Sequence, residues 1–370
     1  MNGSLNWSVK IARLAGIDVY MHWTFLLLLG YVGFVNYRPQ QDLAAAAQGI
    51  ALVMAVFVCV VLHELGHALT ARRYGIGTLD ITLLPIGGVA RLERMPDDPR
   101  QELWVALAGP AVNVVIAAVL LFVTAIAGIA LRLPTVSLLE VAAWATFLRS
   151  LMFINVLLVF FNMLPAFPMD GGRVLRALLA RRFEYARATE LAVRVGQVMA
   201  FLFGMLGLFG PNPLLIFIAL FVYLGAEAEL RSVRWRLALA GVPVRAAMRV
   251  QPVTVGPDLT LSQVAEWVLN VPQRDFPVVD GDQYLGMLRR DALLRGLSEG
   301  RAASSVAENM GQDGKAVDEA EPLDRAVAQM NQLGVASLPV TQLGRFVGLL
   351  TLEDVGRFFS IRAAQRGMAS

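Results

Sequence analysis

Long runs of apolar residues fill the chain up to about Leu230, and beyond that point the pattern becomes the polar and charged mixture of a soluble domain. A membrane-spanning helix needs about 20 mostly apolar residues. Six runs are candidates for such spans, and they lie near residues 21–35, 49–71, 103–131, 141–164, 189–209 and 213–230. The pattern therefore predicts an α-helical polytopic membrane domain over residues 1–230, with a tight turn at Gly210 to Pro213.

A short segment between the second and third runs does not fit a helix. Residues Asp80 to Glu93 are too few to span as a helix and contain Pro85, Gly87 and Gly88. Non-helical backbone at membrane depth is tolerated only where protein or water satisfies its polar groups. The segment therefore predicts a β-hairpin or a re-entrant loop.

The rest of the chain contains an internal repeat with a period of about 62 residues. Val244 to Met248 is echoed by Val306 to Met310, and in each copy an amphipathic helical stretch precedes a short strand. Two packed copies of one αβ unit are therefore expected. The predicted boundaries are residues 231–243 for a basic juxtamembrane linker, 244–370 for the repeat region, and about 244–300 and 306–363 for its two copies.

The placement of charge orients the chain in the membrane. Only 16% of the residues are charged, against about 25% in a soluble domain. Basic clusters at the ends of the runs all fall on one face, at Lys10/Arg13, Arg72/Arg73, Arg176/Arg181/Arg182 and Arg231/Arg234/Arg236, whereas the opposite loops carry only Arg38 and Arg132. The positive-inside rule predicts a multi-pass protein of the cell membrane with both termini cytosolic. No binding motif accompanies the basic clusters, so nucleic acid is not expected as a partner.

The chemistry is concentrated in His63-Glu64-Leu65-Gly66-His67. On a helix the two histidines share one face and lie about 6 Å apart along the axis, so both imidazoles can reach one zinc ion. The glutamate between them is placed to act as a general base on water. Ionisable groups within a spanning helix cost roughly 2.5–3.5 kcal/mol each and indicate function by default. Two structural histidines are the alternative, which leaves Glu64 without a partner.

A catalytic zinc ion typically keeps three protein ligands, so one more is needed. Cys59 is the only cysteine, which excludes a cysteine-based zinc site. His22 begins the first run beside Trp23, a position also typical of an interfacial anchor. Asp170 is the better candidate, because two prolines and two glycines around it interrupt the chain and expose backbone. An aspartate that caps the following helix produces the same pattern.

Together with the histidine motif, Gly109-Pro110-Ala111-Val112-Asn113 and the segment Asn162 to Arg173 resemble the site-2 protease family of intramembrane zinc metalloproteases, of M50 type. The resemblance covers nearly all of the first 230 residues. It is to the six-span bacterial and archaeal branch that carries a C-terminal pair of CBS modules. The fold it implies is a helical membrane domain with a re-entrant β-element, followed by an α/β tandem CBS module.

The resemblance implies a role for each motif residue. One zinc ion is held by His63, His67 and Asp170, and Glu64 activates water and then protonates the leaving amine. Asn113 and Asn162 face the active site, where their amides hold the substrate backbone or stabilise the oxyanion. A polar residue that bonds between spans is an equal alternative for each asparagine.

The resemblance also covers the hairpin. Gly87-Gly88 matches the family's β-element, whose exposed edge can add the substrate as a further strand. A purely structural hairpin is the alternative.

In the second repeat, Thr351 and Asp354 resemble the Thr-x-x-Asp end of a CBS module. That likeness implies an adenine nucleotide, with Thr351 near a phosphate and Asp354 on the ribose hydroxyls. Asp291 is the candidate nucleotide-binding residue of the first repeat, but Arg289 and Arg290 occupy the threonine region before it, so one competent nucleotide site is expected rather than two. A nucleotide-free module that forms a homo-oligomer is the alternative.

These features predict an intramembrane zinc endopeptidase that cleaves transmembrane or membrane-associated proteins and is regulated by its cytosolic CBS pair. The resemblance adds regulated intramembrane proteolysis of an anti-sigma or pro-sigma factor as the expected role. A transporter or channel gated by the CBS pair is the competing class, because intramembrane carboxylates and histidines also suit ion pathways. The intact motif set argues against a catalytically dead scaffold.

Overall fold

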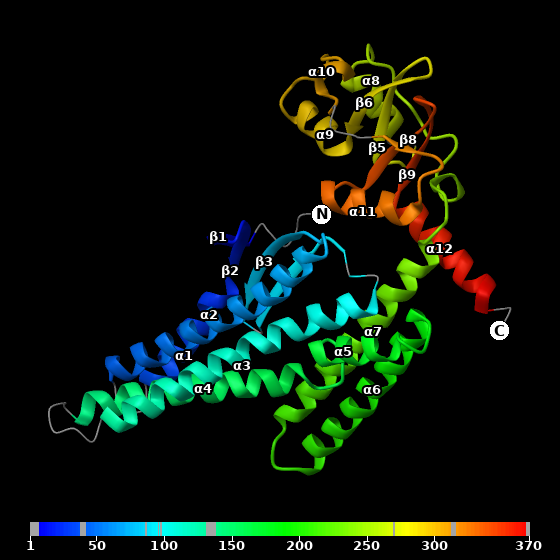
Figure 1. Ribbon diagram of the computed structural model, residues 1–370. Helices are drawn as coiled ribbons and strands as arrows, with labels where there is room; N and C mark the ends of the chain where they lie inside the picture. Colours follow the sequence, from blue (N-terminus) through cyan, green and yellow to red (C-terminus); the bar gives the residue numbers. More distant parts are fainter. Residues whose placement is uncertain are drawn as a thin grey trace. The chain divides into compact units, whose positions relative to one another are not determined.

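The computed structural model describes residues 7–37, 42–85, 87–94, 96, 98–130, 138–268, 271–311 and 316–367 (Figure 1). Arg38 and Arg132, the two basic residues of the opposite loops, lie outside these residues. Apart from its first two residues, the chain divides into a unit from Gly3 to Val233 and a unit from Arg234 to Ser370. The division falls within helix α7.

The first unit contains a helix at each of the six predicted runs. Its helices are α1 (Thr24–Tyr37), α2 (Leu43–Arg73), α3 (Pro99–Ala130), α4 (Leu138–Asn162), α5 (Asp170–Leu179), α6 (Tyr185–Phe209) and α7 (Leu214–Leu239). In the described part of the chain, three helices are long and apolar enough to cross a membrane: α2, Pro99–Ile126 of α3, and α6. Shorter apolar helices cover Thr24–Tyr37 and Thr146–Asn162. Six spans therefore stay a prediction, whereas a helical membrane domain is present.

Helices α1 to α4 lie side by side (Figure 1), and a four-stranded sheet packs against α2. The strands are β1 (Ser8–Leu14), β2 (Ile17–His22), β3 (Thr78–Leu84) and β4 (Gly87–Leu92), in that spatial order. Strands β2 and β3 are parallel and the other two pairs are antiparallel. The predicted hairpin is β3–β4, and β4 forms one edge of the sheet. Strands β1 and β2 were not predicted.

Apolar side chains hold this sheet against the half of α2 that carries the histidine motif. Val19 of β2 and Ile81 of β3 are fully buried and belong to one apolar cluster with Val61 and Leu65 of α2. Burying such side chains contributes about 1.5–3 kcal/mol each. The edge strand β4 is thereby fixed beside the motif.

The second unit consists of two copies of one αβ pattern, as the repeat predicts. Its elements are η1 (Val244–Ala246), α8 (Leu261–Val268), β5 (Asp275–Asp280), β6 (Gln283–Arg289), α9 (Arg290–Ser298), α10 (Val306–Asn309), β7 (Val317–Asp318), α11 (Leu323–Leu333), β8 (Ser337–Gln342), β9 (Arg345–Thr351) and α12 (Leu352–Gly367). Asp275 and Ser337 begin equivalent strands, and the Ser337 hydroxyl donates to Asp275 Oδ2 at 2.6 Å. The copies are therefore joined at matching positions.

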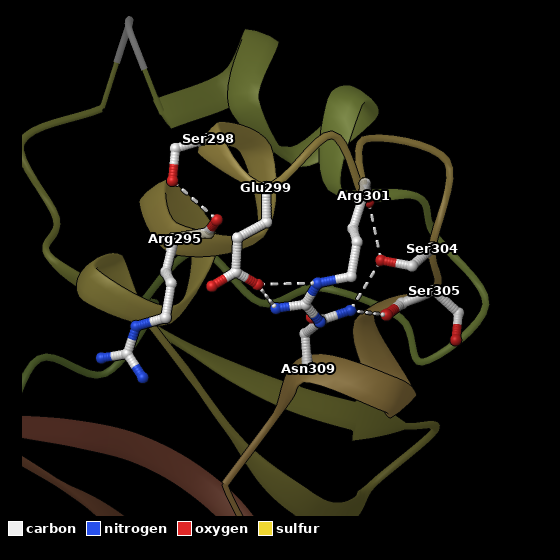
Figure 2. A network of polar contacts seen from close by, with 7 residues as sticks. All are labelled: Arg295, Ser298, Glu299, Arg301, Ser304, Ser305 and Asn309. Atoms are coloured by element: carbon white, nitrogen blue, oxygen red, sulfur yellow. Dashed lines mark hydrogen bonds and ion pairs between the residues drawn. The ribbon is translucent and has the colours of Figure 1, made fainter.

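A polar network fixes the segment that leads from the first copy to the second (Figure 2). The Arg301 guanidinium binds Glu299 Oε2 through Nη2 at 2.6 Å and Asn309 Oδ1 through Nη1 at 2.7 Å. Asn309 Nδ2 in turn donates to Ser304 Oγ at 2.8 Å. These bonds tie the end of α9 to α10, and so set the path between the two repeats.

Candidate metal centre

Helix α2 presents both motif histidines on one face. His63 and His67 are each 6% exposed, and their Nε2 atoms are 3.1 Å apart. Four-residue spacing on a helix brings side chains one above the other, so the two imidazoles converge as the sequence predicts.

Asp170 completes the cluster from a distant part of the chain. Its Oδ2 lies 3.3 Å from Nε2 of His63 and 3.3 Å from Nε2 of His67. Asp170 is the first residue of α5, whose N-cap is Met169. The capping role considered above therefore does not describe it. His22, the other ligand considered, instead bonds through Nδ1 to Thr24 Oγ1 at 2.7 Å.

The three donor atoms fit a zinc ion. Zinc binds histidine nitrogen and carboxylate oxygen at about 2.0–2.2 Å in tetrahedral geometry, so its donors stand about 3.3 Å from one another. The three separations here are 3.1, 3.3 and 3.3 Å. The donor set of two imidazoles and one carboxylate is also typical of catalytic zinc, which keeps its fourth position for water or substrate.

Hydrogen bonds to helix α3 orient both histidine rings. His63 Nδ1 bonds to Asn113 Oδ1 at 2.7 Å, and His67 Nδ1 bonds to the carbonyl oxygen of Val105 at 2.7 Å. Because each Nδ1 carries the proton in such a bond, each Nε2 keeps its lone pair for the metal. Asn113, predicted to contact substrate, thus has its carbonyl oxygen engaged with a metal ligand.

Gly109 lets α3 pass this close to the histidines. A Cβ at this position would lie 2.2 Å from His67 Nε2 and 2.6 Å from His63 Nε2. Only a residue without a side chain fits there. The Gly-Pro-Ala-Val-Asn motif therefore combines a gap at Gly109 with a histidine partner at Asn113, and the motif alone indicated only the asparagine.

Glu64 points to the edge strand β4. Its Oε2 accepts a hydrogen bond from the backbone N–H of Ala90 at 3.1 Å. Gly88, two residues earlier on the same strand, leaves room for the glutamate, since a Cβ there would lie 2.9 Å from Glu64 Cγ. The carboxylate thus lies between the histidines and a strand edge.

These groups line one cavity of about 530 Å³. Its walls include every residue of the membrane domain for which the sequence predicted a role, namely His63, Glu64, His67, Gly87, Gly88, Asn113, Asn162 and Asp170. Val60, Leu157, Leu158 and Phe161 supply apolar surface. The cavity therefore combines a metal centre, a carboxylate outside the ligand set and an apolar wall.

Comparison with known proteins places the chain in a family. Residues 51–203 match the model of peptidase family M50, and residues 244–299 and 306–360 match that of the CBS domain. The chain is 34% identical over 284 residues to the zinc metalloprotease MJ0392 of Methanocaldococcus jannaschii, covering 77% of this chain and 78% of that protein. The chain belongs to peptidase family M50. It is thus a multi-pass membrane zinc metalloprotease of the site-2 type, with its zinc site at His63, His67 and Asp170.

Other M50-related proteins resemble larger or smaller parts of the chain. The protein Rip3 of Mycobacterium tuberculosis is 31% identical over 386 residues, covering 97% of this chain and 94% of Rip3. The solved structure of a site-2 protease from Methanocaldococcus jannaschii is 36% identical and covers 61% of this chain and 96% of its own, with a TM-score of 0.44.

In this M50 protease a buried ionic cluster anchors the helix that carries Asp170. Arg176 of α5 is 0% exposed, and its Nε donates to Glu102 Oε1 of α3 at 2.8 Å. Its Nη1 pairs with Glu229 of α7, and its guanidinium lies 5.0 Å from the ring centroids of Phe167 and Tyr185. Arg176 therefore joins α3, α5 and α7 behind the metal centre.

Removing Arg176 should destabilise the membrane unit. In the Arg176→Met variant Glu102 stays buried without its counter-charge, which costs about 3–5 kcal/mol. We expect a lower melting temperature in detergent, and partial recovery when Glu102→Leu is added. The exposed Arg187, 3.5 Å from Glu190, is the matched control, because Arg187→Met should change the stability by less than about 1 kcal/mol. An unchanged melting temperature for Arg176→Met would show that the cluster is not an anchor.

The CBS residues form a separate polar group. Thr351 Oγ1 donates to Asp354 Oδ2 at 2.7 Å, and Arg249 Nη2 donates to Asp354 Oδ1 at 3.3 Å. Asp291 lies in the first turn of α9. The 62-residue spacing of the copies matches it to Glu353 rather than to Asp354.

Proposed function

We propose that this M50 protease is an intramembrane endopeptidase whose substrates are transmembrane or membrane-associated proteins. The observation that carries the proposal is the metal centre with Glu64, set within an apolar helix and facing a cavity with an apolar wall. Within that substrate class we propose regulated intramembrane proteolysis of an anti-sigma or pro-sigma factor, on the strength of the family resemblance.

The residues divide the chemistry of peptide hydrolysis between them. A zinc ion in this site supplies Lewis acidity, which activates water and polarises the scissile carbonyl. Glu64 is the general base: its Oε2 is held by Ala90, so Oε1 takes the proton from water and then gives it to the leaving amine. Asn162, at the end of α4 on the cavity wall, is the proposed donor to the oxyanion.

The edge of β4 is the proposed docking site for the substrate backbone. Ala90 is paired with Ile81 of β3 and directs its N–H to Glu64, so the outer edge of the strand faces the motif. An extended peptide can add to such an edge through backbone hydrogen bonds. Gly87 and Gly88 line the same cavity and keep that edge free of side chains. A substrate helix that unwinds there presents its peptide bonds beside Glu64.

The test is cleavage by the full-length protein in lipid. With a single-span membrane protein as substrate, chelation should abolish the cleavage product, and one equivalent of zinc should restore it. If the protein were instead a transporter, the same vesicles would show zinc flux and no cleavage product. Zinc flux without cleavage of any membrane protein offered would refute the proposal.

We further propose that six spans place both termini in the cytosol, on the basis of the basic clusters. A cysteine introduced near the C-terminus should react with an impermeant reagent only in inside-out vesicles, and one introduced at Asn212 only in right-side-out vesicles. The opposite labelling pattern would reverse the orientation.

For the CBS pair we propose regulation by an adenine nucleotide bound in the second copy. In this proposal Thr351 binds a phosphate of the nucleotide, and Asp354 binds its ribose hydroxyls. Hydrogen bonds to charged groups contribute about 1.5–3 kcal/mol, so Thr351→Val should weaken AMP or ATP binding roughly 10- to 100-fold in calorimetric titration. Asp291→Ala is the matched control, because a second site is not expected in the first copy. Equal loss in both variants would contradict a single site, and no binding to the wild type would leave the homo-oligomer alternative.

A further inference from the structure

A line of hydrogen bonds runs from helix α4 to a metal ligand and includes Asn155, a residue outside every motif. Asn155 Nδ2 donates to the carbonyl oxygen of Leu151 at 2.8 Å. Asn155 Oδ1 accepts from Asn113 Nδ2 at 3.0 Å, and Asn113 Oδ1 is 2.7 Å from His63 Nδ1. Both asparagines are 0% exposed, so no solvent competes for these bonds.

The line has only one consistent direction. The Leu151 carbonyl can only accept, so Asn155 must turn its NH₂ group to it and its oxygen to Asn113. Asn113 must then donate to Asn155 with its own NH₂ group and turn its oxygen to His63. The oxygen of Asn113 can only accept, so His63 carries its proton on Nδ1. The backbone of α4 thereby sets the tautomer of a zinc ligand through two amides.

We propose that Asn155 is a positioning residue for zinc, which fixes the amide of Asn113 and through it presents His63 Nε2 to the metal. A reversed Asn113 amide would aim an N–H at His63 Nδ1, and the ring proton would then move to Nε2, where it blocks ligation. His67 needs no such relay, because its Nδ1 bonds directly to the Val105 carbonyl, whose direction cannot reverse.

This positioning role can be distinguished by experiment from that of a polar contact between helices. Buried amides between spans also strengthen helix packing. A packing role depends on volume and on the number of hydrogen bonds. The positioning role depends only on which end of the Asn113 side chain faces His63, so a group with two equivalent acceptor oxygens at position 113 makes Asn155 unnecessary.

The experiment measures metal binding rather than proteolysis, so its outcome does not depend on the proposed function. In full-length protein, Asn155→Leu removes the relay and keeps the volume, whereas Asn155→Ala removes it with the least change to the helix. Mutation of a residue in the hydrogen-bond network that orients a zinc ligand typically lowers the affinity for zinc about 10- to 100-fold. We expect that loss in both variants by chelator competition, together with an altered cobalt(II) absorption spectrum.

Rescue decides between the two roles. Adding Asn113→Asp to Asn155→Leu should restore zinc affinity to within about threefold of the wild type, because either carboxylate oxygen accepts the His63 proton. Cys59→Ala is the matched control: Cys59 Sγ is another contact of Asn155 Nδ2, at 3.5 Å, and its removal leaves the relay intact. Wild-type zinc affinity in whichever Asn155 variant folds would overturn the proposal. So would a loss of affinity that Asn113→Asp does not restore.

Discussion

The Glu64→Gln variant should bind one zinc ion as the wild type does and cleave substrate roughly 10²–10⁴-fold more slowly. Glu64 is outside the set of ligands formed by His63, His67 and Asp170. Glutamine has the same shape, and its carbonyl oxygen can still accept from the Ala90 N–H that now binds Glu64 Oε2. It cannot take a proton from water, so only the base is lost. Zinc per protein and the rate of product formation are the two measurements.

Glu93 supplies the matched control for this variant. Its Oε2 also accepts a backbone N–H, that of Gly77 at 3.2 Å, but Glu93 does not line the cavity. Glu93→Gln should therefore cleave at the wild-type rate. Cleavage by Glu64→Gln at that same rate would remove Glu64 from the chemistry, whereas loss of zinc from it would make Glu64 a ligand. We expect an inactive variant that keeps its zinc to retain bound substrate as well, which can then be isolated and identified.

The sequence predicted the parts of this molecule that depend on local spacing. His63 and His67 stand one helical turn apart, so their convergence follows from the motif alone. The CBS pair repeats with a fixed period and was visible for the same reason. Asp170 is different: its position more than 100 residues away carries no geometric information. Composition made it a candidate, and resemblance to a family gave it a role.

The residues that support the metal centre were missed because their roles arise from contacts between distant helices. Gly109 matters only because α3 passes within van der Waals distance of the imidazoles, and nothing in its own helix shows that. Arg176 was interpreted as part of a cytosolic basic cluster, although it is fully buried between two glutamates. Asn155 did carry a signal, since an amide within an apolar run is costly unless it has a partner.

The first two strands were missed for another reason. Residues 8–22 are short and mixed, and the apolar positions Ile17, Val19 and Met21 continue directly into the first apolar run. That run was therefore predicted to begin at residue 21, whereas α1 begins at Thr24. Alternation over so few residues does not outweigh a longer apolar stretch beside it.

The Gly109→Ala variant should bind zinc more weakly while the fold around it stays intact. Alanine favours a helix by about 1 kcal/mol over glycine, so α3 itself gains stability. The added methyl group, however, would lie 2.2 Å from His67 Nε2 and 2.6 Å from His63 Nε2. The rings must turn away, and their lone pairs then no longer converge with Asp170. Overpacking of this kind costs about 1–3 kcal/mol, which corresponds to roughly 5- to 150-fold weaker zinc binding.

Gly204→Ala tests whether this effect comes from the site or from the substitution. Gly204 lies in α6, another long apolar helix, and the nearest atom to a Cβ there is Ala219 Cβ at 3.7 Å, an ordinary contact. That variant should keep both its zinc and its activity. Zinc content, cleavage rate and melting temperature of both variants make the comparison. If Gly109→Ala bound zinc with the wild-type affinity and cleaved normally, then the close passage of α3 would not shape the metal centre. If it lost zinc together with its cooperative melting, the substitution would have broken the helix packing rather than the ligand geometry.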